Sequence, residues 1–184
     1  MNPDSAQLLT DLLRQVSRSF YTTLRVLPSS VRAPIGLAYL LARATDTIAD
    51  TELVSVESRV QALRALRERV LGERSARVDF GELQRHQGEP AEKVLLERVE
   101  EAIGLLGSFS PNDQALIRAV LDTITGGQQL DLERFGGAGA GRIAALSKDA
   151  ELDDYTYRVA GCVGEFWTKI CRAHVFPNAR LDDA

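Results

Sequence analysis

Asp46 and Asp50 are the residues of this sequence whose types and spacing best support chemistry. They are four positions apart, which places both carboxylates on one face of a helix, and Arg43 precedes Asp46 by three positions on that face. Carboxylates without a nearby histidine or cysteine are hard oxygen ligands suited to Mg²⁺, an ion that binds one or two carboxylates together with substrate phosphates. This spacing therefore indicates a magnesium site for a phosphorylated substrate.

An intrahelical ion pair between Arg43 and Asp46 on a solvated face would explain the same spacing. The segment before these charges, Ile35 to Ala42, is apolar nearly all round, so the charges stand at the end of a buried helix. Charges that emerge from a buried helix are costly unless they are paired or bound to a ligand. The residues alone leave both interpretations open.

Three further motifs carry weaker signals. The hydroxyls and guanidinium of Ser17-Arg18-Ser19, followed by Phe20, suit phosphate oxygens, but they also suit the end of a helix. Small residues recur over Val159–Gly164, after Tyr155, and permit the close approach of either a ligand or another helix. The run Gly136–Gly141 lacks the strand and the Gly-Lys-Ser/Thr sequence of a phosphate-binding loop, so a flexible linker is the favoured interpretation.

The periodicity of apolar residues predicts an all-α fold, because no convincing alternating run of β-branched residues occurs. The central helix is expected to begin after caps at Ser29 and Ser30, with Pro34 near its first turn and an apolar body over Ile35–Ala44. The other expected helices are 3–16, a short turn before Pro28, 56–71, 90–106, 111–135 with a bend at Gly126-Gly127, and 153–174. The segment 72–88 is expected to be a surface loop with at most one helical turn.

Length and composition narrow the class of protein. The chain has 184 residues, 45% hydrophobic and 26% charged, so one domain spanning 1–184 is expected. Its net charge of −4 gives no reason to expect nucleic-acid binding, and 2 cysteines and 2 histidines do not form a metal cluster. The N-terminus lacks a signal-peptide pattern and no apolar run is long enough to span a membrane. We therefore expect an intracellular protein, in the cytoplasm or peripherally at a membrane.

Taken together, the motifs resemble the squalene/phytoene synthase family in both order and spacing. The resemblance rests on Ser17-Arg18-Ser19-Phe20, Leu27-Pro28, Tyr39-Leu40, Arg43-Ala44-Thr45-Asp46-Thr47-Ile48-Ala49-Asp50, and Tyr155 with Val159-Ala160-Gly161-Cys162-Val163-Gly164-Glu165. It covers nearly the whole chain, which corresponds to roughly the first two-thirds of a family domain.

The resemblance implies a class I isoprenoid synthase fold, in which helices surround a central cavity. It implies a head-to-head condensation of two prenyl diphosphates, through a cyclopropyl diphosphate, to a squalene- or phytoene-type product. Asp46 and Asp50 would hold Mg²⁺ against the diphosphate, Arg43 would bind its oxygens, and Tyr155 would face the ionised centre. The remaining matched residues would bind substrate: Ser17, Arg18 and Ser19 at the diphosphate, and Phe20, Leu24, Gly36, Tyr39, Ala160, Val163, Gly164 and Trp167 at the tails.

The same resemblance implies the cofactors and partners. These are Mg²⁺, NADPH where the product is of the squalene type, farnesyl or geranylgeranyl diphosphate as substrate, and peripheral membrane contact for product release. The family's site is built from two facing aspartate motifs, and this sequence has the first at Asp46 and Asp50. We do not expect the later acidic pairs to supply the second, because Asp153-Asp154 resembles a helix start and Asp182-Asp183 lies at the end of the sequence. We therefore expect a fragment of a longer enzyme, inactive alone, whose uncovered apolar faces favour self-association.

Two other classes of protein stay open. A non-catalytic scaffold relative of the same family would keep the fold without the chemistry, although the intact Arg43, Asp46 and Asp50 argue against it. A head-to-tail prenyltransferase or terpene cyclase would share the fold and Mg²⁺ but not the Val159–Glu165 sequence. Product analysis separates the two enzymes, and absence of Mg²⁺-dependent diphosphate binding would favour the scaffold.

Overall fold

The computed structural model describes residues 3–17, 19–136 and 143–179, and the regular structure within these ranges is entirely helical, as predicted. The helices are α1 (Pro3–Val16), α2 (Ser19–Val26), α3 (Ser29–Ala49), α4 (Val56–Leu71), α5 (Glu82–His86), α6 (Pro90–Glu97), α7 (Val99–Leu105), α8 (Pro111–Phe135), α9 (Asp149–Thr156) and α10 (Cys162–His174). A 3₁₀ turn (Leu106–Ser108) follows α7, and a π-helical turn (Tyr157–Gly161) joins α9 to α10. No helix in these ranges is long and apolar enough to cross a lipid bilayer.

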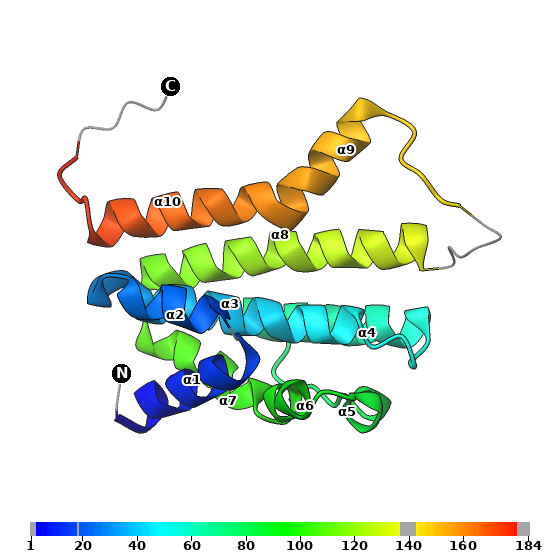
Figure 1. Ribbon diagram of the computed structural model, residues 1–184, viewed down its shortest axis with the longest axis horizontal. Helices are drawn as coiled ribbons and strands as arrows, with labels where there is room; N and C mark the ends of the chain where they lie inside the picture. The colour runs from blue at the N-terminus through cyan, green and yellow to red at the C-terminus, as the bar shows by residue number, and fades with distance from the viewer. Residues whose placement is uncertain (1–2, 18, 137–142, 180–184) are drawn as a thin grey trace.

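The central element is α3, as the apolar run over Ile35–Ala44 predicts. Its body is buried on nearly all sides, and Leu37, Leu40 and Leu41 expose 1% of their surface or less. In Figure 1, α3 lies between a layer of α8 and α10 and a layer of α1, α6 and α7. Burial of so much apolar surface accounts for the stability of this arrangement.

The helices α3 and α8 lie side by side and run in the same direction. Ala38 and Val120 line one pocket, and eight positions further along each helix Asp46 bonds to Gln128. Side chains at matching steps of the two helices therefore face each other.

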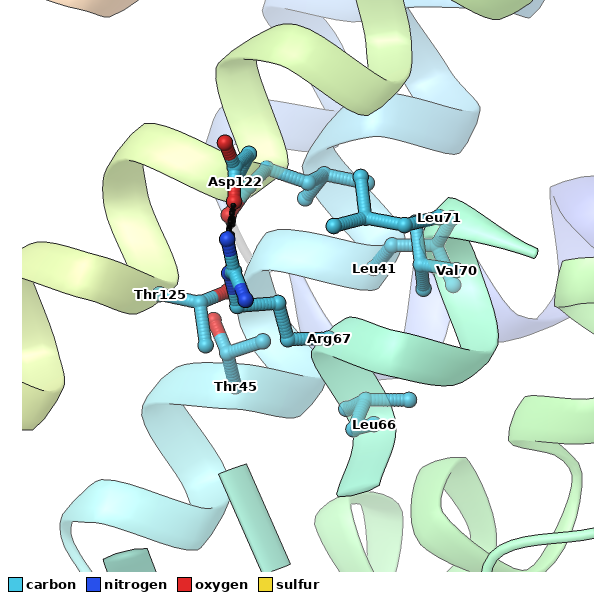
Figure 2. Close-up of a pocket in the computed structure, with 9 residues that line it drawn as sticks. Leu41, Thr45, Leu66, Arg67, Val70, Leu71, Asp122 and Thr125 are labelled. Atoms are coloured by element: carbon cyan, nitrogen blue, oxygen red, sulfur yellow. Dashed lines mark hydrogen bonds and ion pairs between the residues drawn. The ribbon is translucent and has the colours of Figure 1, made fainter. Parts of the chain in front are cut away.

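An ion pair links α4 to α8 next to the contact between α3 and α8. Arg67 Nε and Nη2 lie 2.5 Å from Asp122 Oδ1, and Figure 2 shows the pair next to Thr45 and Thr125. Each threonine hydroxyl donates a hydrogen bond to a carbonyl of its own helix. The cavity at this point measures about 10 Å³, which is room for a single water molecule at most. This region is therefore a packing contact and not a ligand site.

The expected bend at Gly126-Gly127 is wrong, because α8 is continuous over 25 residues and runs without a kink in Figure 1. These glycines instead admit Arg158 of the π-helical turn. A Cβ on Gly127 would lie 2.8 Å from Arg158 Cβ, and one on Gly126 would lie 3.3 Å from Arg158 Nη1. The bend occurs in the last helical segment, where the π-helical turn sets α9 at an angle to α10 (Figure 1).

Three other boundaries differ from the expected ones. Ser29 and Ser30, the expected caps of α3, lie inside its first turn, and Pro28 occupies the N-cap position without a side-chain capping bond. The segment 90–106 is divided into α6 and α7, because Arg98 has φ −106° and ψ 8°, outside the α-helical region. The last helical segment begins at Asp149, four residues before the expected start. The segment 72–88 is largely irregular, as expected, and α5 is its helix. The expectation of a surface loop holds only in part, because Phe80 and Leu83 are buried in the core.

We expect Gly127→Ala to destabilise the protein by about 1–3 kcal/mol. The added methyl group would overlap Arg158 Cβ, which is attached to the backbone and cannot move away freely. Gly126→Ala is the matched control, since its methyl group would meet only the flexible end of the same side chain. Alanine is also favoured over glycine in a helix by about 1 kcal/mol. Urea denaturation measures both variants. A Gly127→Ala protein as stable as Gly126→Ala would contradict the close contact.

Candidate functional site

Asp46 lies between α3 and α8 and not in bulk solvent. Gln128 Nε2 of α8 donates a hydrogen bond of 2.5 Å to Asp46 Oδ1. Burial raises the pKa of Asp46 to about 6. The charge of Arg43 and the hydrogen bond from Gln128 oppose this rise, and the carboxylates of Asp50 and Glu92 add to it. Asp46 is therefore a carboxylate whose charge the protein alone compensates only in part.

Arg43 forms an ion pair with Glu92 of α6. Burial disfavours the charged form of Arg43, but the Glu92 carboxylate outweighs this effect, so the pKa of Arg43 is raised. The Arg43 Nε atom is buried and has no acceptor among the described residues. The guanidinium is thus held in place with one donor unused.

Asp50 stands at the C-terminal cap of α3 and is exposed. Loss of part of its hydration raises the pKa of Asp50, and Arg43 opposes the rise. Arg59 of α4 also lowers this pKa, and its Nη1 donates a 2.6 Å hydrogen bond to the Ala49 carbonyl at the helix end. A cation at this place stabilises the C-terminus of a helix. Asp50 is therefore the solvent-facing member of the aspartate pair.

An apolar pocket of about 120 Å³ lies at the other end of the same α3 face. It is lined from α2, α3, α8 and α10 by Phe20, Ile35, Ala38, Tyr39, Ala42, Val120, Ile124, Val163, Phe166 and Trp167. The rings of Phe20 and Tyr39 stack with centroids 4.5 Å apart. Four of the expected tail-binding residues, Phe20, Tyr39, Val163 and Trp167, thus meet in one pocket.

Tyr39 joins the pocket to the charged cluster. Its ring lines the pocket, while burial raises the pKa of its hydroxyl and the charges of Arg43 and Asp46 act on it. Arg43 and Asp46 follow Tyr39 at one and two helical turns along α3. The face therefore passes from apolar to charged without interruption, which suits a ligand with an apolar tail and an anionic head.

The structure places other expected substrate residues away from this pocket. Gly36 faces α1, where an added Cβ would lie 2.9 Å from Leu13 Cδ1, so its small size serves helix packing. Leu24 is buried in the core at 2% exposure. Ser17 is buried, and its hydroxyl donates to the Leu13 carbonyl at the end of α1. These contacts agree with the helix-end interpretation of this segment. Ser19 begins α2, and Arg18 lies outside the described residues.

Tyr155, Ala160 and Gly164 do not line this pocket. Tyr155 is half-buried in α9, which departs from α8 at an angle in Figure 1. Ala160 and Gly164 are exposed, and open space surrounds the position of a Cβ on Gly164. A cavity shared by Asp46 and Tyr155 therefore stays a prediction.

Sequence reasoning missed Gln128, Glu92 and Arg59. Gln128 follows Val120 and Ile124 at helical spacing, and a polar residue that continues an apolar stripe was an available signal. Glu92 lies in the first turn of a helix, where acidic residues are common, so its position in the sequence gives no sign that it pairs with Arg43. Arg59 is one of several arginines in its helix, and its sequence neighbours do not distinguish it, but it is 8% exposed and bonds to the end of α3.

The residues at this site fit a magnesium ion that is bound together with a phosphorylated ligand. The described residues contain no group of three or more His, Cys, Asp or Glu side chains that could enclose a metal. Mg²⁺ requires six ligands, so Asp46 and Asp50 would leave several positions for water and phosphate. Three polar groups at this site are available to such a ligand. The charge of the Asp46 carboxylate is compensated only in part, and Gln128 Oε1 and Arg43 Nε have no hydrogen-bond partner within the described part of the chain.

Solved structures define the class of the fold. A complex of TcSQS with the ligand E5700 superimposes with a TM-score of 0.72 at 23% identity, and it covers 94% of this chain and 45% of that one. A second complex of TcSQS, with BPH1237, gives a TM-score of 0.69 at 24% identity. The fold is therefore the all-α class I isoprenoid synthase type.

Sequence relatives identify the family. A family model described as squalene/phytoene synthase matches residues 13–184. The bifunctional lycopene cyclase/phytoene synthase of Blakeslea trispora is 28% identical over 92% of this chain and 26% of its own length. The Botryococcus squalene synthase of Botryococcus braunii is 30% identical over 86% of this chain and 30% of its own length. The chain belongs to the squalene/phytoene synthase family, and it spans less than a third of the length of these two relatives.

Proposed function

We propose that this chain binds a prenyl diphosphate, with Mg²⁺ and the diphosphate at Asp46 and Asp50 and the tail in the apolar pocket. The reaction is the head-to-head condensation of two such substrates to a squalene- or phytoene-type product. The observation that carries the proposal is the unbroken passage from pocket to charged cluster at Tyr39. Membership of the family supports the reaction class.

Condensation begins when the allylic C–O bond of one substrate breaks and its diphosphate leaves. Mg²⁺, when bound, neutralises charge on this leaving group. Arg43 contributes a fixed positive charge, and we assign its unused Nε–H to a diphosphate oxygen. Glu92 holds the guanidinium, so little reorganisation is needed as the charge develops.

The remaining allylic cation is attacked by the double bond of the second substrate, and loss of a proton closes the cyclopropane ring. Aromatic faces stabilise a cation, and Tyr39 and Trp167 supply such faces in a pocket with apolar walls. Exclusion of water prevents capture of the cation as an alcohol. We place Tyr155 near the ionised carbon. The cyclopropyl diphosphate then loses the second diphosphate to leave another cation, which loss of a proton would convert to a phytoene-type product and hydride from NADPH to a squalene-type product.

We further propose that turnover needs an additional element with its own carboxylates. We assign the pair Asp46 and Asp50 to the diphosphate, and two carboxylates compensate its metal ions only in part. Asp149 and Asp153 have the same spacing, but both are exposed on α9 and we give them no role at the diphosphate. The pocket is also smaller than the roughly 300 Å³ of an ordinary ligand site. Exposed apolar side chains at Leu152 and Val159 support a further protein surface on α9 and the π-helical turn.

Calorimetry with farnesyl thiodiphosphate, which resists ionisation, tests the proposal. We expect binding that requires Mg²⁺ and that is weaker for inorganic pyrophosphate, which lacks the tail. With farnesyl or geranylgeranyl diphosphate, Mg²⁺ and NADPH, we expect the chain alone to form no head-to-head product at ordinary enzyme rates. Absence of Mg²⁺-dependent binding would favour a scaffold role, and rapid product formation would refute the need for a further element.

A further inference from the structure

Gln128 occupies the place on α8 where the apolar pocket gives way to the charged cluster. Val120 and Ile124 of the same helix face line the pocket, and Gln128 is the next residue at four-position spacing. An apolar side chain here would extend the pocket wall. An amide stands in its place and reaches across to α3.

The two ends of the Gln128 amide have different partners. Nε2 donates a 2.5 Å hydrogen bond to Asp46 Oδ1, and the carboxylate acceptor fixes the orientation of the amide. Oε1 is buried, and no described residue donates a hydrogen bond to it. A buried acceptor without a donor is costly in a protein that has no ligand. The side chain therefore presents an acceptor beside a carboxylate that we assign to the metal.

We propose that Gln128 is a positioning residue for the metal and diphosphate, an inference that rests on the proposed function. Its Nε2 holds the Asp46 carboxylate in one orientation, and its Oε1 accepts a hydrogen bond from a water bound to Mg²⁺. Mg²⁺ keeps several of its waters in protein sites, and such waters act as donors. Partners of this kind, one step removed from a metal, alter affinity by about tenfold to a hundredfold.

A purely structural role for Gln128 predicts a different result. If the amide only satisfied a buried carboxylate, its loss would lower the unfolding temperature but would leave the dependence on Mg²⁺ unchanged. The test therefore compares the Mg²⁺ concentration needed for half-maximal pyrophosphate binding with the thermal midpoint of the same variant. Mn²⁺ in place of Mg²⁺ adds a spectroscopic readout, because its EPR line width responds to changes in its ligands and waters.

The test variant is Gln128→Met, which keeps the length of the side chain and removes both the donor and the acceptor. The matched control is Gln129→Met, because Gln129 lies on an exposed part of α8 and bonds only to Glu133 within the helix. We expect Gln128→Met to need about tenfold more Mg²⁺ for pyrophosphate binding and to change the Mn²⁺ line width. We expect Gln129→Met to match the unsubstituted protein in both.

The outcomes separate this inference from the proposed function. Unchanged Mg²⁺ dependence in Gln128→Met, with normal binding by the unsubstituted protein, would overturn the positioning role and leave the proposed function standing. Absence of Mg²⁺-dependent binding in the unsubstituted protein would overturn both. Should Gln128→Met fail to fold, Gln128→Asn withdraws the amide from Asp46 by one methylene and is expected to give the same shift.

Discussion

Asp46→Asn is expected to weaken Mg²⁺-dependent diphosphate binding by roughly a hundredfold or more. The substitution keeps the shape of the side chain but replaces a charged oxygen ligand with a neutral amide, and a metal–carboxylate interaction supplies several kcal/mol. Asp50→Asn is expected to act in the same direction. Calorimetric titration of farnesyl thiodiphosphate in the presence and absence of Mg²⁺ measures both losses.

The matched control for this prediction is Asp122→Asn. Asp122 is also a half-buried aspartate of a helix, but its carboxylate pairs with Arg67 in the packing contact of Figure 2. Its substitution should leave Mg²⁺-dependent binding within about twofold of normal, because surface-type ion pairs contribute little. Equal losses in Asp46→Asn and Asp122→Asn would mean that binding follows general stability, and the assignment of Asp46 would be wrong.

The same Asp46→Asn substitution is expected to stabilise the metal-free protein by about 2–3 kcal/mol at pH 7.5. The pKa of Asp46 rises from 3.8 to about 6 on folding. A carboxyl group whose pKa is raised in the folded state disfavours folding when it is ionised, by about 1.4 kcal/mol for each pH unit. An asparagine carries no charge at any pH, so this cost disappears in the variant.

The dependence on pH has a definite sign. The cost is fully present above pH 6, and it declines as the pH falls through 6 toward 3.8, where both states bind the proton. Urea denaturation in EDTA should therefore show a difference between Asp46→Asn and the unsubstituted protein that shrinks between pH 7.5 and pH 4. A constant difference over this range, or a less stable variant at pH 7.5, would contradict the raised pKa. A residue that weakens the fold and serves the site is typical of functional positions.

The helical class and the central helix could be predicted because both depend on local pattern. The apolar run over Ile35–Ala44 determines that α3 is buried, whatever packs against it. The spacing of Arg43, Asp46 and Asp50 determines that they share one face, because every helix has the same pitch. The Ser110 cap and Pro111 likewise determine where α8 begins.

The glycine pair in α8 illustrates where local pattern fails. Glycine is compatible with either a bend or close packing, and its sequence neighbours do not distinguish the two. The deciding residue, Arg158, lies in a different helical segment and approaches only in the folded chain. The same holds for Gly36, whose neighbour is Leu13 of α1 and not a substrate pocket.

The sequence by itself determined the aspartate motif and the helix that carries it, and it predicted the metal chemistry. Only the tertiary structure decided which groups complete the site: Gln128 is 82 residues from Asp46, and Glu92 is 49 residues from Arg43. Partners at such separations are set by how helices pack, and the period of a helix specifies a face without specifying what lies opposite. The pKa of Asp46 is also a property of the tertiary structure, because packing against α8 removes water from around the carboxylate.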